Sequence, residues 1–72
     1  MNLAHCCIDN YINGNLKDAK DQAKHISAPR LYATLREDYG KEYKAAISIA
    51  MYLKGQCSWQ QACNTDVSVH HS

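Results

Sequence analysis

Cysteine and histidine side chains, the usual ligands of structural zinc, gather near the two ends of this sequence. They are His5, Cys6 and Cys7 at one end and Cys57, Cys63, His70 and His71 at the other. Zinc fingers take their cysteines in pairs about two to four residues apart, and the step from Cys57 to Cys63 is wider. We therefore expect no metal and no cofactor, and we expect all four cysteines to behave as small apolar residues.

A catalytic centre is the second kind of chemistry that reactive side chains could support. His5 stands beside Cys6 in the sequence, but a nucleophile needs its base within hydrogen-bond reach in the fold, which adjacency does not supply. The carboxylates of Glu37, Asp38 and Glu42 fall at expected helix ends, where charges are solvated. The three glycines are isolated from one another, so none forms a phosphate-binding loop. The sequence therefore predicts a protein that is not an enzyme.

A group of basic residues raises nucleic-acid binding as an alternative function. The group consists of Lys17, Lys20, Lys24, Arg30 and Arg36. Residues 18–39 could form a helix-turn-helix whose turn is Ser27-Ala28-Pro29, and a second, truncated match covers residues 53–68. Acidic residues lie between the basic ones in the sequence, a pattern that is typical of a solvated helix face. The net charge of the chain is only +1, so no strong positive charge points to a nucleic-acid partner. A DNA-binding regulator therefore stays the alternative.

The elements that must position these side chains are helices. Apolar residues recur at helical spacing, and Gly14, Gly40 and Gly55 follow three of the apolar stretches as helix stops. A Ser-x-x-Gln capping box at Ser58 predicts a short further helix through Cys63. We expect helices over residues 2–12, 16–26, 28–39, 41–54 and 58–63, with Asn15 and Ser27 or Ala28 as N-caps and Pro29 in the first turn of the third.

Length and composition restrict the fold to one small all-α domain. The chain has 72 residues, no Phe, five Tyr and one Trp, and its many Ala and Leu residues favour helices. We expect a bundle of four helices plus a short C-terminal fifth helix in residues 1–64, followed by a flexible tail in residues 65–72. No secretory signal starts the sequence, and no apolar run approaches the ~20 residues of a membrane span. The expected location is the cytoplasm, with no membrane partner.

The fourth expected helix is apolar nearly all round. Its first stripe contains Tyr43, Ala46, Ile47, Ala50 and Met51, and its second contains Ala45, Ile49, Tyr52 and Leu53. A helix of this kind is either covered by every neighbouring helix or shared with a second copy or a partner. Because the other helices offer only narrow stripes, the sequence favours a shared surface on the second stripe. The partner or dimer residues are then Ile49, Tyr52 and Leu53, with Trp59 as an aromatic anchor.

Several segments of the chain also resemble small accessory proteins encoded by enterobacterial temperate phages and prophages. The segments are residues 2–5, 11–16, 35–40 and 52–55 with Trp59-Gln60, and the likeness covers most of residues 2–64. The resemblance implies a phage or prophage protein that acts by binding a host or phage protein or a nucleic acid. It carries over no functional residues, because none is assigned in that group.

Together these observations predict a non-enzymatic protein that works by protein–protein interaction, as a homodimer or with another protein, and that takes no small-molecule substrate. The alternative is the helix-turn-helix-like DNA-binding transcriptional regulator. The two differ in whether the basic residues converge on one exposed face of the folded chain, and salt-dependent retention on nucleic acid distinguishes them.

Overall fold

The structure, a computed structural model, describes residues 2–58 and residue 60. These residues contain four helices. They are α1 (Leu3–Ile12), α2 (Leu16–Ala23), α3 (Ala28–Glu37) and α4 (Tyr43–Leu53), and no strand occurs within these residues. The prediction of four helices and an all-α fold is confirmed. The fifth helix, Trp59 as an anchor and the boundary between residues 64 and 65 lie outside the described residues.

Side-chain caps explain where α1 and α3 begin. Asn2 accepts a hydrogen bond from the backbone N–H of His5 at 2.9 Å, and Ser27 accepts one from Arg30 at 3.3 Å. Each cap satisfies an N–H group that the helix itself leaves without a partner. Pro29 stands in the first turn of α3, where its missing N–H costs nothing. Of the two N-cap candidates, Ser27 and Ala28, the structure shows Ser27 as the cap.

α1 and α4 each end before a glycine with a left-handed backbone conformation. After α1, Gly14 has a φ of 86°, and after α4, Gly55 has a φ of 79°. The N–H of the following residue then bonds back to the last turn, from Asn15 to the carbonyl of Asn10 at 2.8 Å and from Gln56 to that of Met51 at 2.7 Å. Both ends are Schellman motifs, in which a left-handed glycine lets the chain satisfy the final carbonyl groups.

Two helices end earlier than the sequence indicated. α2 ends at Ala23, and residues 24–26 continue in tighter turns, with Ile26 donating to the carbonyl of Ala23 at 3.1 Å. α3 ends at Glu37, three residues before Gly40, and Lys41 closes that end by donating to Leu35 at 3.0 Å. Ends of this kind satisfy terminal carbonyl groups without prolonging the α-helix.

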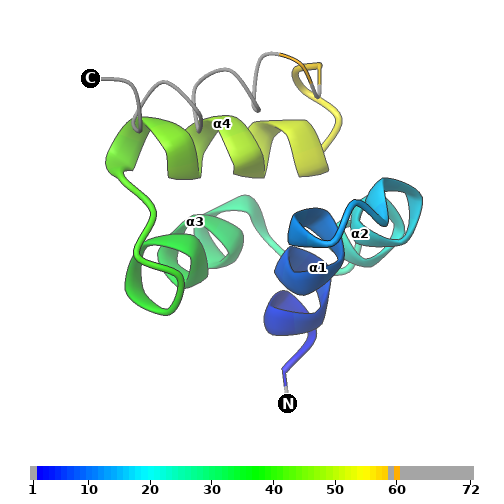
Figure 1. The fold of residues 1–72 in the computed structure, drawn as a ribbon, viewed down its shortest axis with the longest axis horizontal. Coiled ribbons are helices and arrows are strands. Elements are labelled where there is room, and N and C mark those ends of the chain that lie inside the picture. Colours follow the sequence, from blue (N-terminus) through cyan, green and yellow to red (C-terminus); the bar gives the residue numbers. More distant parts are fainter. Residues whose placement is uncertain (1, 59, 61–72) are drawn as a thin grey trace.

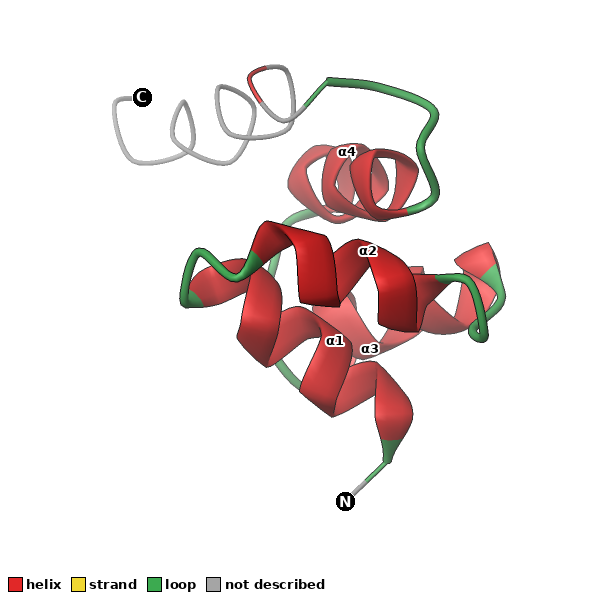
Figure 2. Ribbon diagram, turned by 90° about the vertical axis from the view of Figure 1, so that its right-hand side faces the viewer, coloured by secondary structure: helices red, strands yellow, loops and turns green. Residues whose placement is uncertain are grey.

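The four helices form two hairpins, each made from neighbours in the chain. α1 packs mainly on α2 and α3 mainly on α4, while α1 also contacts α3 and α2 contacts α4 (Figures 1 and 2). Figure 2 shows α4 above α2, with α1 below α2. The largest side chains that are completely buried are Ile8, Leu31, Leu35 and Ile49. Ala4, Ala19, Ala23 and Ala46 are also buried, and such small residues let the helices approach closely.

α4 turns its second stripe into this core. Ile49, Tyr52 and Leu53 are each at most 5% exposed within the single chain, and the Tyr52 ring lies 6.1 Å from that of Tyr11 on α1. The neighbouring helices therefore cover the stripe for which the sequence favoured a shared surface. The exposed apolar residues of α4 belong instead to its first stripe, where Tyr43 is 58% and Met51 39% exposed.

None of the four described helices has the length and apolar character that crossing a lipid bilayer requires.

Candidate functional site

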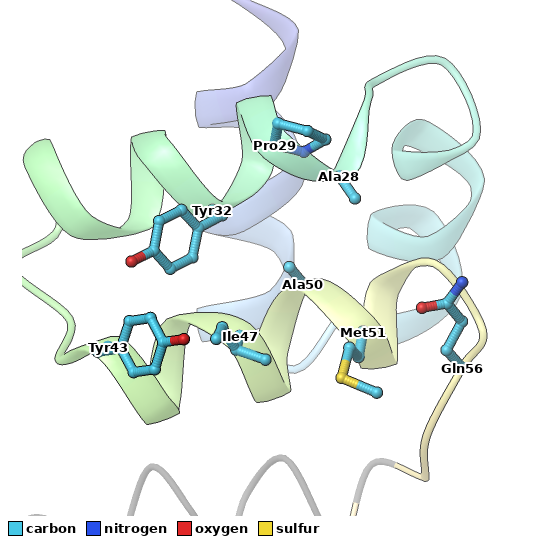
Figure 3. A pocket seen from close by; sticks show the side chains of 8 residues that line it. All are labelled: Ala28, Pro29, Tyr32, Tyr43, Ile47, Ala50, Met51 and Gln56. Carbon is cyan, nitrogen blue, oxygen red and sulfur yellow. The ribbon is translucent and has the colours of Figure 1, made fainter.

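An apolar groove that is open to solvent lies between α3 and α4 in the part of the chain that the structure describes. Its volume is about 430 Å³, and Figure 3 shows side chains from both helices and from the turn after α4 around it. The lining residues are Ala28, Pro29 and Tyr32 on α3, Tyr43, Ile47, Ala50 and Met51 on α4, and Gln56. We call this feature the α3–α4 groove.

Helical spacing explains why these side chains share the groove. On α4, Tyr43, Ile47 and Met51 are four residues apart and so form one row along the helix. On α3, Leu31 and Leu35 point into the core, and Tyr32 stands about 100° around the helix from Leu31, at the core's edge. The groove is thus lined by apolar residues that flank the core-facing side of each helix.

Two tyrosines and one arginine give the groove its geometry. The rings of Tyr32 and Tyr43 meet edge to face, with centroids 6.0 Å apart and planes at 85°, an arrangement that aromatic pairs favour. The guanidinium of Arg36 lies 6.0 Å from the centroid of Tyr32, at the outer limit of a cation–π contact. A positive charge therefore stands beside the aromatic part of the lining.

The lining of the groove is mostly apolar, and its polar side-chain groups are two tyrosine hydroxyls and one amide. None of the eight lining residues is an acid, a histidine, a lysine or a cysteine, and Gln56 supplies the single side-chain amide. Apolar side chains that enter such a groove gain about 25 cal/mol for each Å² of apolar surface removed from water. The arrangement therefore offers an apolar ligand burial, with few groups that could direct a reaction.

A smaller basic hollow, about 120 Å³ in volume, lies between α2 and the end of α4. Lys20, Lys24, Leu53, Lys54 and Gly55 line it. The Lys54 ammonium donates hydrogen bonds to the carbonyl oxygens of Ala23 at 2.9 Å and Ile26 at 2.8 Å, so it caps the end of α2. The sequence had not identified this role of Lys54, because the partners lie 28 and 31 residues away.

The basic residues proposed for nucleic-acid binding fall into separate places. Lys20 lies over the Tyr52 ring at 5.2 Å, and Lys24 pairs with Asp21 at 3.4 Å, both near the basic hollow. Arg36 instead lies beside Tyr32 at the α3–α4 groove. Lys17 and Arg30 are exposed on α2 and α3. The contacts of Lys20, Lys24 and Arg36 thus place these three residues at two different hollows.

A polar cluster joins α1 to the end of α3. His5 Nε2 lies 2.6 Å from Asp38 Oδ2, and the Tyr39 hydroxyl donates to Asp9 Oδ1 at 2.7 Å and lies 3.1 Å from the carbonyl oxygen of His5. Partial burial and the adjacent Asp9 carboxylate raise the pKa of Tyr39 to about 12. Asp38, expected to be a solvated charge, therefore has a specific partner 33 residues away. These contacts hold α1 against the C-terminal end of α3.

The cysteines of the described segment pack and donate hydrogen bonds. Cys7 is buried, and its thiol donates to the carbonyl of Ala19 at 3.1 Å, while the thiol of Cys57 donates to that of Ser48 at 3.4 Å. Burial raises the pKa of Cys7 to about 11, although the positive charge of Lys54 opposes the shift. No disulfide joins Cys6, Cys7 and Cys57.

Metal-ligand geometry is absent from residues 2–58 and 60, where no group of three or more His, Cys, Asp and Glu residues could hold an ion. Cys63, His70 and His71, which the sequence analysis considered as zinc ligands, lie outside the described residues.

Sequence reasoning named none of the eight lining residues as a partner contact, and the large side chains among them include Tyr32, Tyr43 and Met51. Their signal was present in the first stripe of α4, where Tyr43, Ile47 and Met51 recur every four residues. The periodicity identified that stripe but not the direction in which it faces, since the second stripe is equally apolar. The residues favoured as partner contacts, Ile49, Tyr52 and Leu53, lie in the core instead.

Comparisons with protein-family models, with curated protein sequences and with solved structures found no match.

Proposed function

We propose that this chain is a non-enzymatic accessory protein of the phage or prophage type, acts in the cytoplasm by protein–protein interaction, and binds its partner in the α3–α4 groove. One observation carries the proposal: an apolar groove of about 430 Å³ opens on a small domain in which Tyr43 remains 58% exposed. Large apolar side chains left uncovered together commonly mark an interaction surface.

The composition of the groove supports a protein partner. Tyrosines are enriched at binding hot spots because they provide large contact areas with little conformational freedom. Met51 adds an adaptable thioether, which fits partner side chains of irregular shape. Burial of one Leu-sized side chain of the partner contributes about 1.5–3 kcal/mol, so two or three such contacts stabilise a specific complex once the cost of association is met.

Site-specific photocrosslinking in enterobacterial cells tests the proposal. We expect benzoylphenylalanine at Tyr43 to crosslink the chain to a discrete second protein. The matched control carries the same group at Ile12, which is 54% exposed on α1 and does not line the groove. Identical products from both positions, or none from Tyr43, would contradict the proposal. A chain that combines the crosslinker at Tyr43 with Met51→Glu should no longer form the product.

A further inference from the structure

The shape of the α3–α4 groove restricts the kind of partner that it fits. The row from Tyr43 to Met51 spans eight steps from residue to residue and therefore about 12 Å along α4. This length matches two turns of a partner helix, whose side chains at i, i+4 and i+7 lie on one face. At about 430 Å³ the groove accommodates inserted side chains, while the partner backbone stays above it.

The backbone around the groove argues against an extended partner strand. α3 and α4 line it, and helices use their N–H and C=O groups internally. Strand addition requires a sheet edge with unpaired backbone groups, and the described part of the chain contains no strand. Contacts with a partner must therefore be made chiefly through side chains, as in a helix that lies in a groove.

The charges beside the groove define the partner further. Directly before and after Tyr43 in the chain stand Glu42, which is acidic, and Lys44, which is basic. Arg36 adds a positive charge over Tyr32, and α4 itself contains Lys44 but no acidic residue. The surroundings are thus more positive than negative, which favours acidic residues on the partner.

We propose that the α3–α4 groove binds an amphipathic helix of a partner protein that inserts apolar side chains between Tyr32, Tyr43 and Met51 and places acidic residues beside Arg36 and Lys44. This inference rests on the proposed function and adds the chemistry of its partner. A second copy of the chain fits less well, because its own groove has the same positive surroundings and a two-fold contact would bring like charges together.

Two helical peptides test the proposal as direct probes. Both carry Leu at i, i+3, i+4 and i+7, and one is flanked by Glu while the other is flanked by Lys. Titration of the isotope-labelled full chain, followed by NMR, should show saturable binding with shifts at Tyr32, Tyr43 and Met51. We expect the acidic peptide to bind about tenfold more tightly at low salt, the effect of two ion pairs near the upper end of the range for exposed pairs.

Charge reversal provides the matched comparison. Arg36→Glu and Lys17→Glu change the net charge equally, but only Arg36 contacts a groove residue. Arg36→Glu should remove or invert the preference for the acidic peptide, whereas Lys17→Glu should bind like the parent chain. Equal affinity for the two peptides, no saturable binding of either, or equal effects of the two variants would overturn the proposal.

Two further measurements test whether a second copy of the chain, or the chain's own residues after Ser58, occupies the groove instead. Self-association in sedimentation equilibrium that Met51→Glu abolishes would overturn the proposal in favour of a second copy. A change in the fluorescence of Trp59 caused by Met51→Glu, without peptide, would overturn it in favour of the chain's own residues after Ser58. If the crosslinks from Tyr43 persist while the peptides show no charge preference, the proposed function stands and this inference fails.

Discussion

Lys54 shows how much one side chain contributes to the joining of distant segments. Its ammonium group donates to the carbonyl oxygen of Ala23, the last residue of α2, and to that of Ile26, and the residue also lines the basic hollow. Carbonyl groups at a helix end otherwise depend on water, and the negative end of the helix dipole favours a cation. The lysine thus fastens the end of α4 to the end of α2.

Replacement of this lysine should lower the stability of the whole domain. We expect Lys54→Met, which keeps the length of the side chain, to reduce the free energy of unfolding by about 1–3 kcal/mol, because two carbonyls lose a charged donor. Lys44→Met on the exposed side of α4 is the control and should stay within about 0.5 kcal/mol. Urea denaturation followed by circular dichroism measures both, and equal midpoints would contradict the role of Lys54.

Cys7 and Tyr39 make stability depend on alkaline pH. The pKa of Cys7 rises from 9.0 to about 11 through burial, and that of Tyr39 rises from 10.0 to about 12 through burial and its bond to Asp9. Each group keeps its proton longer in the folded state than in the unfolded state. Their stabilising effect is therefore complete below the unfolded pKa values and is lost as pH rises through the folded ones.

We accordingly expect the free energy of unfolding to fall steadily above pH 9. Tyr39→Phe should be less stable at neutral pH, because it lacks the hydroxyl that donates to Asp9, but its stability should fall less steeply between pH 10 and 12. Denaturation curves at a series of pH values measure both slopes. A slope for Tyr39→Phe as steep as that of the parent chain would show that this tyrosine does not govern the decline.

At the scale of the elements, sequence periodicity predicted the four helices, and residue types predicted the helix stop at Asn13-Gly14 and an N-cap at Ser27 or Ala28, because these are local features. Asn15 also stands at the predicted N-cap position of α2, but its side chain makes no capping hydrogen bond. Asn13-Gly14 and Ser27 act within a few residues of their own positions, so their effects can be recognised without the fold. The orientation of α4 could not be predicted in the same way. Which apolar stripe is buried depends on contacts such as that of Tyr52 with Tyr11, 41 positions earlier in the chain.

The two stripes of α4 should respond differently to a charge. Ile49→Asp places a carboxylate in the core, where an unpaired charge costs several kcal/mol, and we expect the chain to unfold. Ile47→Asp lies on the partly exposed stripe and should leave the helical circular dichroism intact while it removes binding at the groove. Thermal denaturation of both variants compares them, and an equally folded Ile49→Asp protein would contradict the orientation of α4.

At the scale of the whole molecule, the balance of charge bears on the two functions that the sequence raised. The chain has eight basic and seven acidic residues. Lys24 lies beside the carboxylate of Asp21, Lys54 beside backbone carbonyl groups and Arg36 beside the ring of Tyr32. Binding to duplex DNA requires several cations that reach phosphates together, and its strength falls steeply with salt.

We expect little retention of the full chain on duplex DNA at physiological salt, and a shallow dependence on salt concentration at lower salt. Chromatography on immobilised duplex DNA over a series of salt concentrations measures this dependence. Strong retention that Lys20→Glu and Lys24→Glu both weaken, with Lys44→Glu as the control, would instead favour the DNA-binding regulator, with the basic hollow as its contact surface.

The pairing of neighbouring helices also bears on the speed of folding. Because α1 packs mainly on α2 and α3 mainly on α4, the most extensive contacts close short loops. Domains dominated by local contacts of this kind fold in roughly microseconds to milliseconds. The groove lies entirely within the second hairpin and the turn that follows it, so no contact between its lining residues has to wait for the N-terminal hairpin to find its place.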